Sequence, residues 1–277
     1  MPSRRPKEHT FVVLAFGDSP HLDDCLRSLR GQAEASDVLL STSTPSAHVI
    51  ETARRYGVAV KAVPGARGIG ADWNAALATS QTDWVTLAHQ DDVYLPNFGK
   101  SVRQSLAEHP EALLCFTGYR EMSGGCVLRK SPNLLVKDLL LAMSFRRARS
   151  IESPAGKRLL LALGSPIPCP AVTFNLPNLD GFAFSTELRV NLDWAAWLDL
   201  ADRPGSFVRV REALMHHRLH EESTTWNSIR DGARRSEDRA CFCRVWPRGL
   251  AGALCAAYGL SYRFNRIGSR RATREGG

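Results

Sequence analysis

The chain has 277 residues, 44% of them hydrophobic, so it can bury a sizeable core, and extensive disorder is not expected. Its formal net charge of +8 is uneven: the segment Arg203–Gly277 holds 15 Arg, no Lys and 7 acidic residues, a net of +8 that leaves the rest neutral. Seven cysteines without paired spacing argue against a disulfide framework or a zinc site and fit a reducing cytosol. No leader is visible and no apolar run reaches the ~20 residues of a membrane span. We therefore expect a cytoplasmic protein, or one peripheral at the inner face of the cell membrane.

The first half of the chain alternates short apolar runs with amphipathic segments. We predict strands at residues 11–16, 38–40, 58–63 and 84–88. Helices are expected between them: the first capped by Asp18 or Ser19, the second opened by Thr44, and the third following the loop Gly65–Gly70. Four βα units in a row predict an α/β fold with a mostly parallel sheet, in which ligands bind at the carboxyl ends of the strands.

The predicted strand at 84–88 ends in an acidic tip, His89-Gln90-Asp91-Asp92. Two adjacent carboxylates repel each other, so keeping both ionised requires a cation or hydrogen-bond donors nearby. Oxygen ligands of this kind suit Mg²⁺ or Mn²⁺, and these ions neutralise a diphosphate. The alternative is that the two acids open the next helix, where the helix dipole favours them.

The Gly65–Gly70 loop is a weaker signal. Its glycines would let the backbone approach a phosphate, and Arg67 would pair with an anion. The loop has neither a Walker motif nor dinucleotide-binding spacing, so a plain flexible connection is the alternative.

The second half holds two further informative segments. The pattern predicts a helix at 97–108, a strand at 112–117, a hairpin turn at 123–125, a helical run at 134–145 and a strand at 171–174. The segment Leu192–Ala201 then predicts another helix. Asp193 lies at its start, as a functional carboxylate or only as an N-cap. His216, His217 and His220 then cluster in five positions, which favours a metal ligand among them.

Together these segments resemble the inverting family 2 glycosyltransferases of GT-A fold, over about residues 11–225. The resemblance is carried by five segments in the family's order: Asp18–Leu29 with Gln32, Gly68–Asn74, His89–Asp92 with Pro96, Leu192–Ala201, and His217–Thr224. It implies a GT-A domain over residues 1–225, with a mostly parallel central sheet and flanking helices. A basic helical C-terminal extension, residues 226–277, would follow it.

The resemblance also implies a reaction and a set of residues. A sugar would move, with inversion, from a nucleotide-diphosphate sugar to a hydroxyl of a glycan or lipid-linked acceptor, in glycan or cell-envelope polysaccharide synthesis; no nucleic-acid partner is implied. Asp193 would be the general base, and Asp91 and His220 would hold Mn²⁺ or Mg²⁺. The donor would be contacted by Ala15, Ser43, Thr44, Arg67, Asn74, His89, Asp91 and Asp92.

Three departures from the family pattern leave other functions open. Ser43 and Thr44 stand where family members carry an acid, His89 replaces the first aspartate of the tip, and Leu192 replaces a glutamate. A catalytically decayed protein that binds nucleotide or sugar, or serves as an interaction module, is therefore one alternative. A nucleotidyltransferase is another, although Ala15–Ser19 lacks the Gly- and Arg-rich loop that such an enzyme needs after its first strand.

The tail is predicted to form two helices. The segment Trp226–Trp246 is rich in arginine, Pro247 ends it, and an apolar stripe follows at Leu250, Leu254, Tyr258 and Tyr262. We expect the first helix to pack on the catalytic domain and the arginines, including Arg263, Arg266, Arg270 and Arg271, to face an anionic membrane or a lipid-linked acceptor. The alternative is a helix pair that caps the domain or forms a homodimer.

Overall fold

The computed structural model describes residues 5–65, 68–128, 132–220 and 233–259. Its strands are β1 (Arg5–Ala15), β2 (Asp37–Thr42), β3 (Ala59–Ala62), β4 (Thr82–His89), β5 (Val93–Tyr94), β6 (Ala112–Ser123), β7 (Cys126–Val127), β8 (Ser150–Ile151), β9 (Val172–Asn175) and β10 (Ser206–Arg218). Its helices are α1 (Leu22–Arg30), α2 (Ala47–Arg55), α3 (Ile69–Thr79), α4 (Phe98–Glu108), α5 (Pro132–Phe145), α6 (Pro154–Leu161), α7 (Leu192–Ala201), α9 (Ala233–Cys243) and one over residues 248–259. Two 3-10 turns, η1 (Cys169–Ala171) and η2 (Leu176–Asn178), flank β9.

These strands form one sheet in the order β3-β2-β1-β4-β9-β6-β10-β5, with β7 paired to β6 and β8 to β10. The pairs β2–β3, β1–β2, β1–β4 and β6–β10 are parallel. Because β9 is antiparallel to both β4 and β6, these two strands run in the same direction, and so do β1, β2, β3 and β10. The predicted α/β fold with a mostly parallel central sheet is therefore confirmed.

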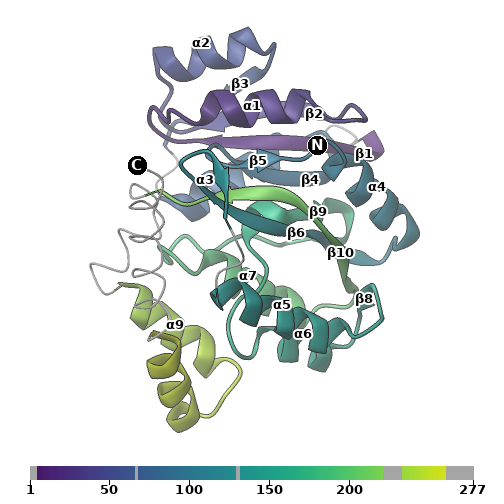
Figure 1. Cartoon of the computed structure of the whole chain (residues 1–277), viewed down its shortest axis with the longest axis vertical. Helices are drawn as coiled ribbons and strands as arrows, with labels where there is room; N and C mark the ends of the chain where they lie inside the picture. Colours follow the sequence, from purple (N-terminus) through teal and green to yellow (C-terminus); the bar gives the residue numbers. More distant parts are fainter. Residues whose placement is uncertain (1–4, 66–67, 129–131, 221–232, 260–277) are drawn as a thin grey trace.

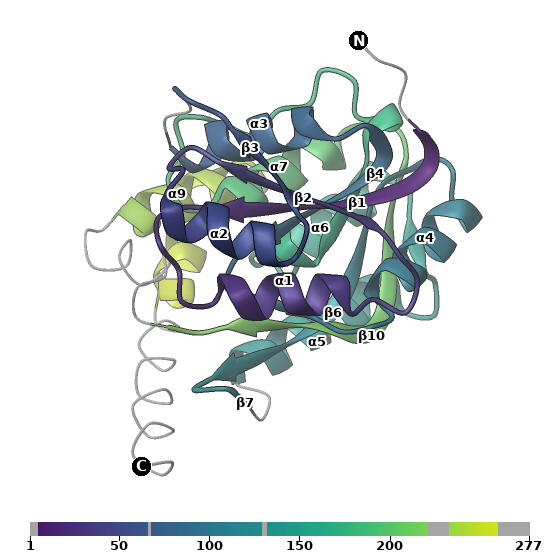
Figure 2. The same ribbon diagram turned by 90° about the horizontal axis from the view of Figure 1, so that it is seen from above.

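Helices cover both faces of this sheet (Figures 1 and 2). Alternation along β1 sends Phe11 and Val13 into a core shared with α1, α2 and α4, while Val12 joins the core formed with α3, α5, α6, α7 and α9. In Figure 1, α1 and α2 lie towards the top, α4 lies on the right, and α5, α6, α7 and α9 lie in the lower half. The carboxyl ends of the strands are thus left for ligands, as the topology predicts.

Helix faces follow the sequence pattern, but two helix starts differ from the prediction. The apolar face of α1, Leu22, Cys25, Leu26 and Leu29, is buried as expected. The expected cap is wrong, because the N-cap residue is His21 and its side chain forms no capping bond. Ser46, not Thr44, caps α2 by accepting the Val49 N–H at 3.1 Å.

The Gly65–Gly70 segment is shorter as a loop than predicted, because α3 begins at Ile69 and includes Gly70. A Cβ at Gly70 would lie 2.0 Å from the Ser185 carbonyl oxygen, so only glycine allows this approach. Asn74 reinforces the contact: its amide donates to the Phe184 carbonyl at 2.9 Å and accepts the Phe184 N–H at 2.7 Å. The start of α3 is thereby fixed to the loop that leads into α7.

Replacing Gly70 with alanine should destabilise the protein. Alanine favours a helix by roughly 1 kcal/mol, but the clash with Ser185 backbone requires the loop to move, at a cost of about 1–3 kcal/mol. We expect a lower urea midpoint at an unchanged m-value. Gly252→Ala is the control, since Gly252 is also helical and a Cβ there meets nothing within 4 Å, so that variant should match or exceed the wild type. A Gly70→Ala midpoint at the wild-type value would contradict the packing argument.

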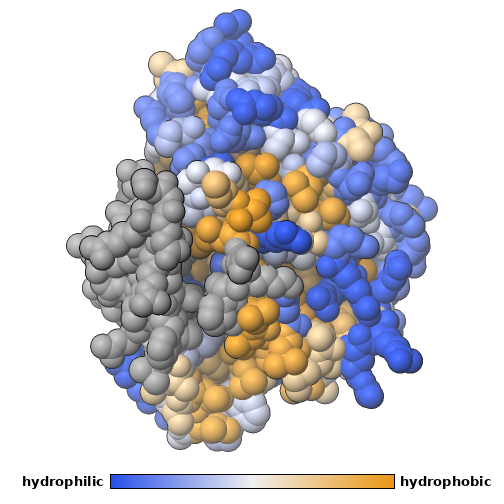
Figure 3. Space-filling view, viewed as in Figure 1, coloured by the Kyte–Doolittle hydropathy of each residue, from blue (hydrophilic) through white to orange (hydrophobic). Residues whose placement is uncertain are grey.

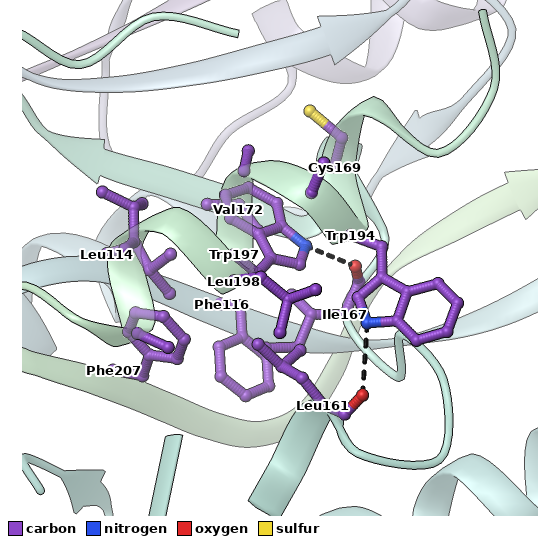
Figure 4. Packing of buried hydrophobic residues seen from close by; sticks show 14 of the residues in the cluster. Leu114, Phe116, Leu161, Ile167, Cys169, Val172, Trp194, Trp197, Leu198 and Phe207 are labelled. Atoms are coloured by element: carbon purple, nitrogen blue, oxygen red, sulfur yellow. Dashed lines mark hydrogen bonds between the residues drawn. The ribbon is translucent and has the colours of Figure 1, made fainter. Parts of the chain in front are cut away.

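The larger core is built around α7 (Figure 4). Trp194 and Trp197 are almost fully buried, and their indole N–H groups donate to the carbonyls of Leu161 at 3.2 Å and Ile167 at 3.0 Å. Both bonds satisfy groups that would otherwise be buried without partners. This anchoring fixes the start of α7, where Asp193 lies. All seven cysteines are free, and no helix in the described ranges is long and apolar enough to cross a membrane.

Candidate active site

The acidic tip lies at the carboxyl end of β4 and is held between two loops. The Gln90 amide accepts the Phe16 N–H at 3.1 Å and donates to the Phe16 carbonyl at 2.9 Å. The Asp92 N–H donates to the His89 carbonyl at 3.1 Å, closing a turn before β5. The next helix, α4, begins only at Phe98, so the two acids do not open a helix.

The two carboxylates of the tip have different surroundings. The Asp91 side chain is 25% exposed, whereas that of Asp92 is 1% exposed. Asp92 Oδ1 accepts the Arg218 N–H and contacts His217 Nδ1, each at 3.0 Å. Only Asp91 is open to a ligand from solvent, and the Asp92 carboxylate ties the tip to β10.

Asp92 and His217 stabilise each other's charged forms. Burial alone would raise the pKa of the Asp92 carboxyl, but the charge and hydrogen bond of His217 hold that pKa below its ordinary value. Burial alone would lower the pKa of His217, but the Asp92 charge and hydrogen bond raise it. Each group thus favours the charged form of the other, which offsets the repulsion expected between adjacent carboxylates.

Asp91 is surrounded by groups from three segments. Ser19 donates its hydroxyl to Asp91 Oδ1 at 2.6 Å, and His220 Nε2 lies 3.1 Å from Asp91 Oδ2. Arg218 donates to the Asp91 carbonyl at 2.8 Å and to Asp24 at 3.1 Å, which fixes the backbone of the tip. The structure thus brings together Asp91 and His220, the two predicted metal ligands.

His89 closes the inner side of the tip. Its ring lies 5.4 Å from that of Trp73, centroid to centroid. Burial lowers the pKa of His89, and its Nε2 has no hydrogen-bond partner within the described ranges. The His89 ring thus leaves one buried nitrogen without a partner among the described residues.

The ends of β1 and β2 are joined beside the tip. Ala15, the last residue of β1, pairs with Thr42, and the Gly17 N–H donates to Thr44 Oγ1 at 2.8 Å. Asp72, in the first turn of α3, lies near Ser43, whose hydroxyl lowers the pKa of the Asp72 carboxyl.

Asp72 is a site residue that the sequence analysis missed. Burial raises the pKa of its carboxyl, the Ser43 hydroxyl opposes that rise, and Oδ1 has no hydrogen-bond partner among the described residues. An acid therefore stands beside the end of β2 after all, supplied by α3 and not by the strand. An aspartate in the first turn after the glycine loop was the available signal.

Asp193 lies in the first turn of α7 and is not its N-cap, which is Asn191. Its Oδ1 accepts the Trp194 N–H at 2.7 Å. Burial raises the pKa of the Asp193 carboxyl, although the Trp194 N–H and the charges of Arg234 and Lys137 oppose that rise. A carboxylate whose affinity for a proton is raised in this way suits a general base.

Lys137 of α5 connects Asp193 with the tip. Its Nζ donates to Tyr119 Oη at 3.1 Å, and the Tyr119 ring lies 6.3 Å from that of His217. The charge of Lys137 acts on both Asp193 and His217. Lys137 therefore lies near enough to both Asp193 and His217 to influence the pKa of each.

The helix α9 holds the segment before Asp193, which the sequence did not indicate. The Glu237 carboxylate accepts the N–H groups of Arg189, Val190 and Asn191 at 2.8, 3.0 and 2.9 Å. Asn191 also donates to Asp238 at 2.7 Å. The arginine-rich tail segment thus positions the start of α7 and packs on the core, as expected of the first tail helix.

The remaining predicted residues fall into two groups. The Asn74 amide is used by the Phe184 backbone, so it fixes the loop before α7. Arg67 lies outside the described residues, as do Ser223, Thr224 and residues 260–277, which include the tail arginines named above.

Comparisons with known proteins identify the family to which this fold belongs. The sequence model described as Glycosyl transferase family 2 matches residues 10–158, more than half of the chain. A search of curated proteins found no significant match.

Solved structures match over most of the chain. TarS 1-349 from S. aureus, in complex with UDP-GlcNAc, is 14% identical at a TM-score of 0.61, covering 93% of this chain and 73% of that one. Glucosyl-3-phosphoglycerate synthase from Mycobacterium tuberculosis, in complex with Mn²⁺, UDP and glucosyl-3-phosphoglycerate, is 17% identical at a TM-score of 0.58. The match covers 86% of this chain and 80% of that one. At these identities the likeness shows the GT-A fold, and the family match shows descent: the chain belongs to glycosyl transferase family 2.

Proposed function

We propose that this protein is a metal-dependent, inverting glycosyltransferase that moves a sugar from a nucleotide diphosphate to an acceptor hydroxyl. One observation carries the proposal: the candidate site holds two carboxylates in contrasting surroundings. Asp91 is partly exposed and lies 3.1 Å from His220, while burial raises the pKa of the Asp193 carboxyl. The first arrangement suits a leaving diphosphate and the second suits a base.

The nucleotide would bind at the ends of β1 and β2. Ser43, Thr44 and Asp72 offer hydroxyl and carboxylate groups there, and Ala15 ends the adjacent strand. Asp72 Oδ1, which has no partner among the described residues, would accept an N–H, and a uracil edge provides one. The two structural neighbours described above were solved with uridine nucleotides, which supports uridine as the first base to test.

The residues at the tip fit a divalent cation. No group of three or more His, Cys, Asp or Glu side chains suited to a metal occurs in the described ranges, so only Asp91 and His220 would hold it. Diphosphate oxygens and water would complete the coordination. An imidazole ligand favours Mn²⁺ over Mg²⁺. Such an ion would offset the charge that develops on the leaving diphosphate.

Asp193 would remove the proton from the acceptor hydroxyl as its oxygen attacks the anomeric carbon. The C–O bond to the diphosphate breaks in the same step, on the opposite face of the sugar, so the anomeric configuration inverts. The negative charge of the carboxylate passes to the leaving diphosphate. Asp92, His217 and Arg218 would hold the tip in place without touching the substrate.

A donor screen tests this function directly. Purified protein is incubated with Mn²⁺ and a panel of nucleotide-diphosphate sugars, and release of the nucleoside diphosphate is measured beside calorimetry with the corresponding diphosphates. Metal-dependent binding of one nucleotide together with slow hydrolysis of its sugar supports the enzyme. Failure of every nucleotide to bind, with or without metal, would favour the catalytically decayed alternative.

We also propose that the enzyme contacts an anionic membrane, through α5 and the basic tail. Of the exposed large apolar side chains in the described residues, Leu135, Val136, Leu139 and Met143 lie on α5, and Leu159, Leu163 and Leu250 lie on segments that follow. Figure 3 shows apolar side chains gathered over α5 and α6 in the lower half of this face. The exposed Arg146, Arg147 and Arg149 follow α5, and residues 260–277 add five arginines against one acid. Apolar side chains beside basic ones suit an anionic lipid surface.

Liposome flotation should show binding to anionic vesicles that falls with salt. The double variant Leu139→Gln/Met143→Gln should lower the partition coefficient about tenfold or more, because two exposed side chains no longer insert. Ile50→Gln is the control, since Ile50 is similarly exposed but lies on α2, at the opposite end of the molecule.

A truncation that removes the tail should leave the buried core residues in place. Ala251 and Cys255 are buried, so truncation after residue 259 is preferable to truncation near Pro247. Equal recovery with neutral vesicles, or no binding to either kind, would remove membrane contact from the proposal.

A further inference from the structure

A cavity of about 110 Å³ lies between α5 and the strands β6 and β10. It opens where the pairing of these strands shifts register between Arg209 and Ala213. Gly118 allows the shift, since a Cβ there would lie 3.0 Å from the Glu212 carbonyl oxygen. At about 30 Å³ per water, the cavity has room for a small polyatomic ion.

The lining of this cavity is predominantly positive. Arg120, Lys137, Arg209 and Arg211 line it, against one carboxylate, Asp138. None of these four cations forms an ion pair with a carboxylate of the described chain. Concentrating cations in a partly enclosed space is unfavourable unless an anion joins them.

Arg209 lacks an acceptor at the cavity wall. Its guanidinium lies over the Phe145 ring, 5.8 Å from the centroid, and its Nε is buried without a hydrogen-bond partner among the described residues. Burial and the nearby Arg211 both lower the pKa of Arg209. A buried N–H without an acceptor costs about 1–3 kcal/mol, which an anion in the cavity would recover.

The position of the cavity separates it from the nucleotide side of the site. In the sheet, β9 lies between β4, which carries the tip, and β6, which lines the cavity. Lys137 lines the cavity and also acts on Asp193, while its partner Tyr119 contacts His217. The cavity therefore shares Lys137 with the surroundings of Asp193, and two strands, β4 and β9, separate β6 from β1.

We infer that this cavity binds a phosphate group of the acceptor, so that the acceptor is a phosphorylated sugar or polyol or a lipid-linked phosphate. Three or four cations around a small space favour phosphate over a neutral group, and arginine pairs with phosphate through two parallel N–H groups. A phosphate held here would place a hydroxyl of the same molecule toward Asp193. The assignment of this phosphate to the acceptor rests on the proposed function, but phosphate binding itself does not.

The test uses inorganic phosphate as the probe. Its binding to the protein is measured by ³¹P NMR in the absence of metal and nucleotide. The wild type should bind phosphate saturably, and Arg209→Gln should bind it about tenfold more weakly or worse, because hydrogen bonds to charged groups contribute about 1.5–3 kcal/mol. Arg248→Gln is the control: Arg248 is exposed, lies in the helix over 248–259, and carries the same charge change. A second variant, Arg120→Gln, is used if Arg209→Gln does not fold. Arg120 is exposed, lies on the neighbouring strand β6 and also lines the cavity, so its loss should weaken phosphate binding at least threefold.

Competition identifies the source of the phosphate. Displacement of the probe by glycerol 3-phosphate but not glycerol indicates a small phosphorylated acceptor, and displacement by a micellar alkyl phosphate indicates a lipid-linked one. Equal phosphate binding by the wild type, Arg209→Gln and Arg120→Gln would overturn the site. Phosphate binding lost in Arg209→Gln, together with failure of the donor screen, would instead keep the site and reject the glycosyltransferase function.

Discussion

Replacing Asp193 with asparagine should lower the rate of sugar transfer by about 10²–10⁴-fold, while nucleotide-sugar binding stays at the wild-type level. The amide keeps the shape of the side chain and its bond to the Trp194 N–H by its carbonyl oxygen, but it cannot accept the acceptor proton. Transfer kinetics and calorimetry with the donor measure the two effects separately. Full turnover in this variant would remove Asp193 from the mechanism.

The pH profile adds a check on the same residue. A general base must be ionised, and burial raises the pKa of Asp193 above its ordinary value of 3.8. The wild type should therefore lose activity on acidification at a higher pH than an exposed aspartate would require, and the residual activity of Asp193→Asn should lack that limb. Asp199→Asn is the matched control: it lies on the same helix, is exposed, and its ion pair with Arg244 is a surface one.

The sequence predicts the local part of this fold well. A buried strand and an amphipathic helix each leave a period of apolar residues, so β1, α1 and β4 are found where the pattern places them. The apolar residues of Leu192–Ala201 likewise mark α7. The helix starts are less predictable, because several neighbouring residues could each serve as the N-cap. Ser46 caps α2, although Thr44 lies two residues before it, and Gly68 is the N-cap residue of α3.

What the sequence does not indicate depends on contacts between distant segments. Asp91 and Asp92 are identical in type and adjacent, and only the pairing of the tip with His217 and Arg218 makes one buried and the other open. Asp72 is 29 residues from Ser43 in the chain, so its position near the end of β2 can be seen only in the folded structure. Glu237 binds backbone N–H groups that lie more than 40 residues earlier in the chain, and no sequence motif marks this contact. Such contacts have no periodic signature.

The adjacent acids of the tip allow a sharp test of metal binding. Asp91→Asn should abolish metal-dependent nucleotide binding and lower the rate of transfer about 10²-fold or more. A divalent cation stabilises the charge that develops on the leaving diphosphate by several kcal/mol, and the variant would lose that stabilisation. The folded state should keep its stability, since Asp91 is partly exposed. Calorimetry with Mn²⁺ and uridine diphosphate, beside thermal unfolding, measures both quantities.

Asp92→Asn, one residue away, should show the reverse pattern. Its carboxylate is buried and pairs with His217, so its loss should cost about 1–3 kcal/mol of stability, limited because the His217 side chain is 35% exposed. Mn²⁺ affinity, measured below the new melting temperature, should change little, because the carboxylate faces His217 and Arg218 and not the solvent. If the two variants lost metal affinity to the same extent, Asp91 and His220 alone would not be the side chains that hold the cation, and Asp92 would have to turn outward on binding it.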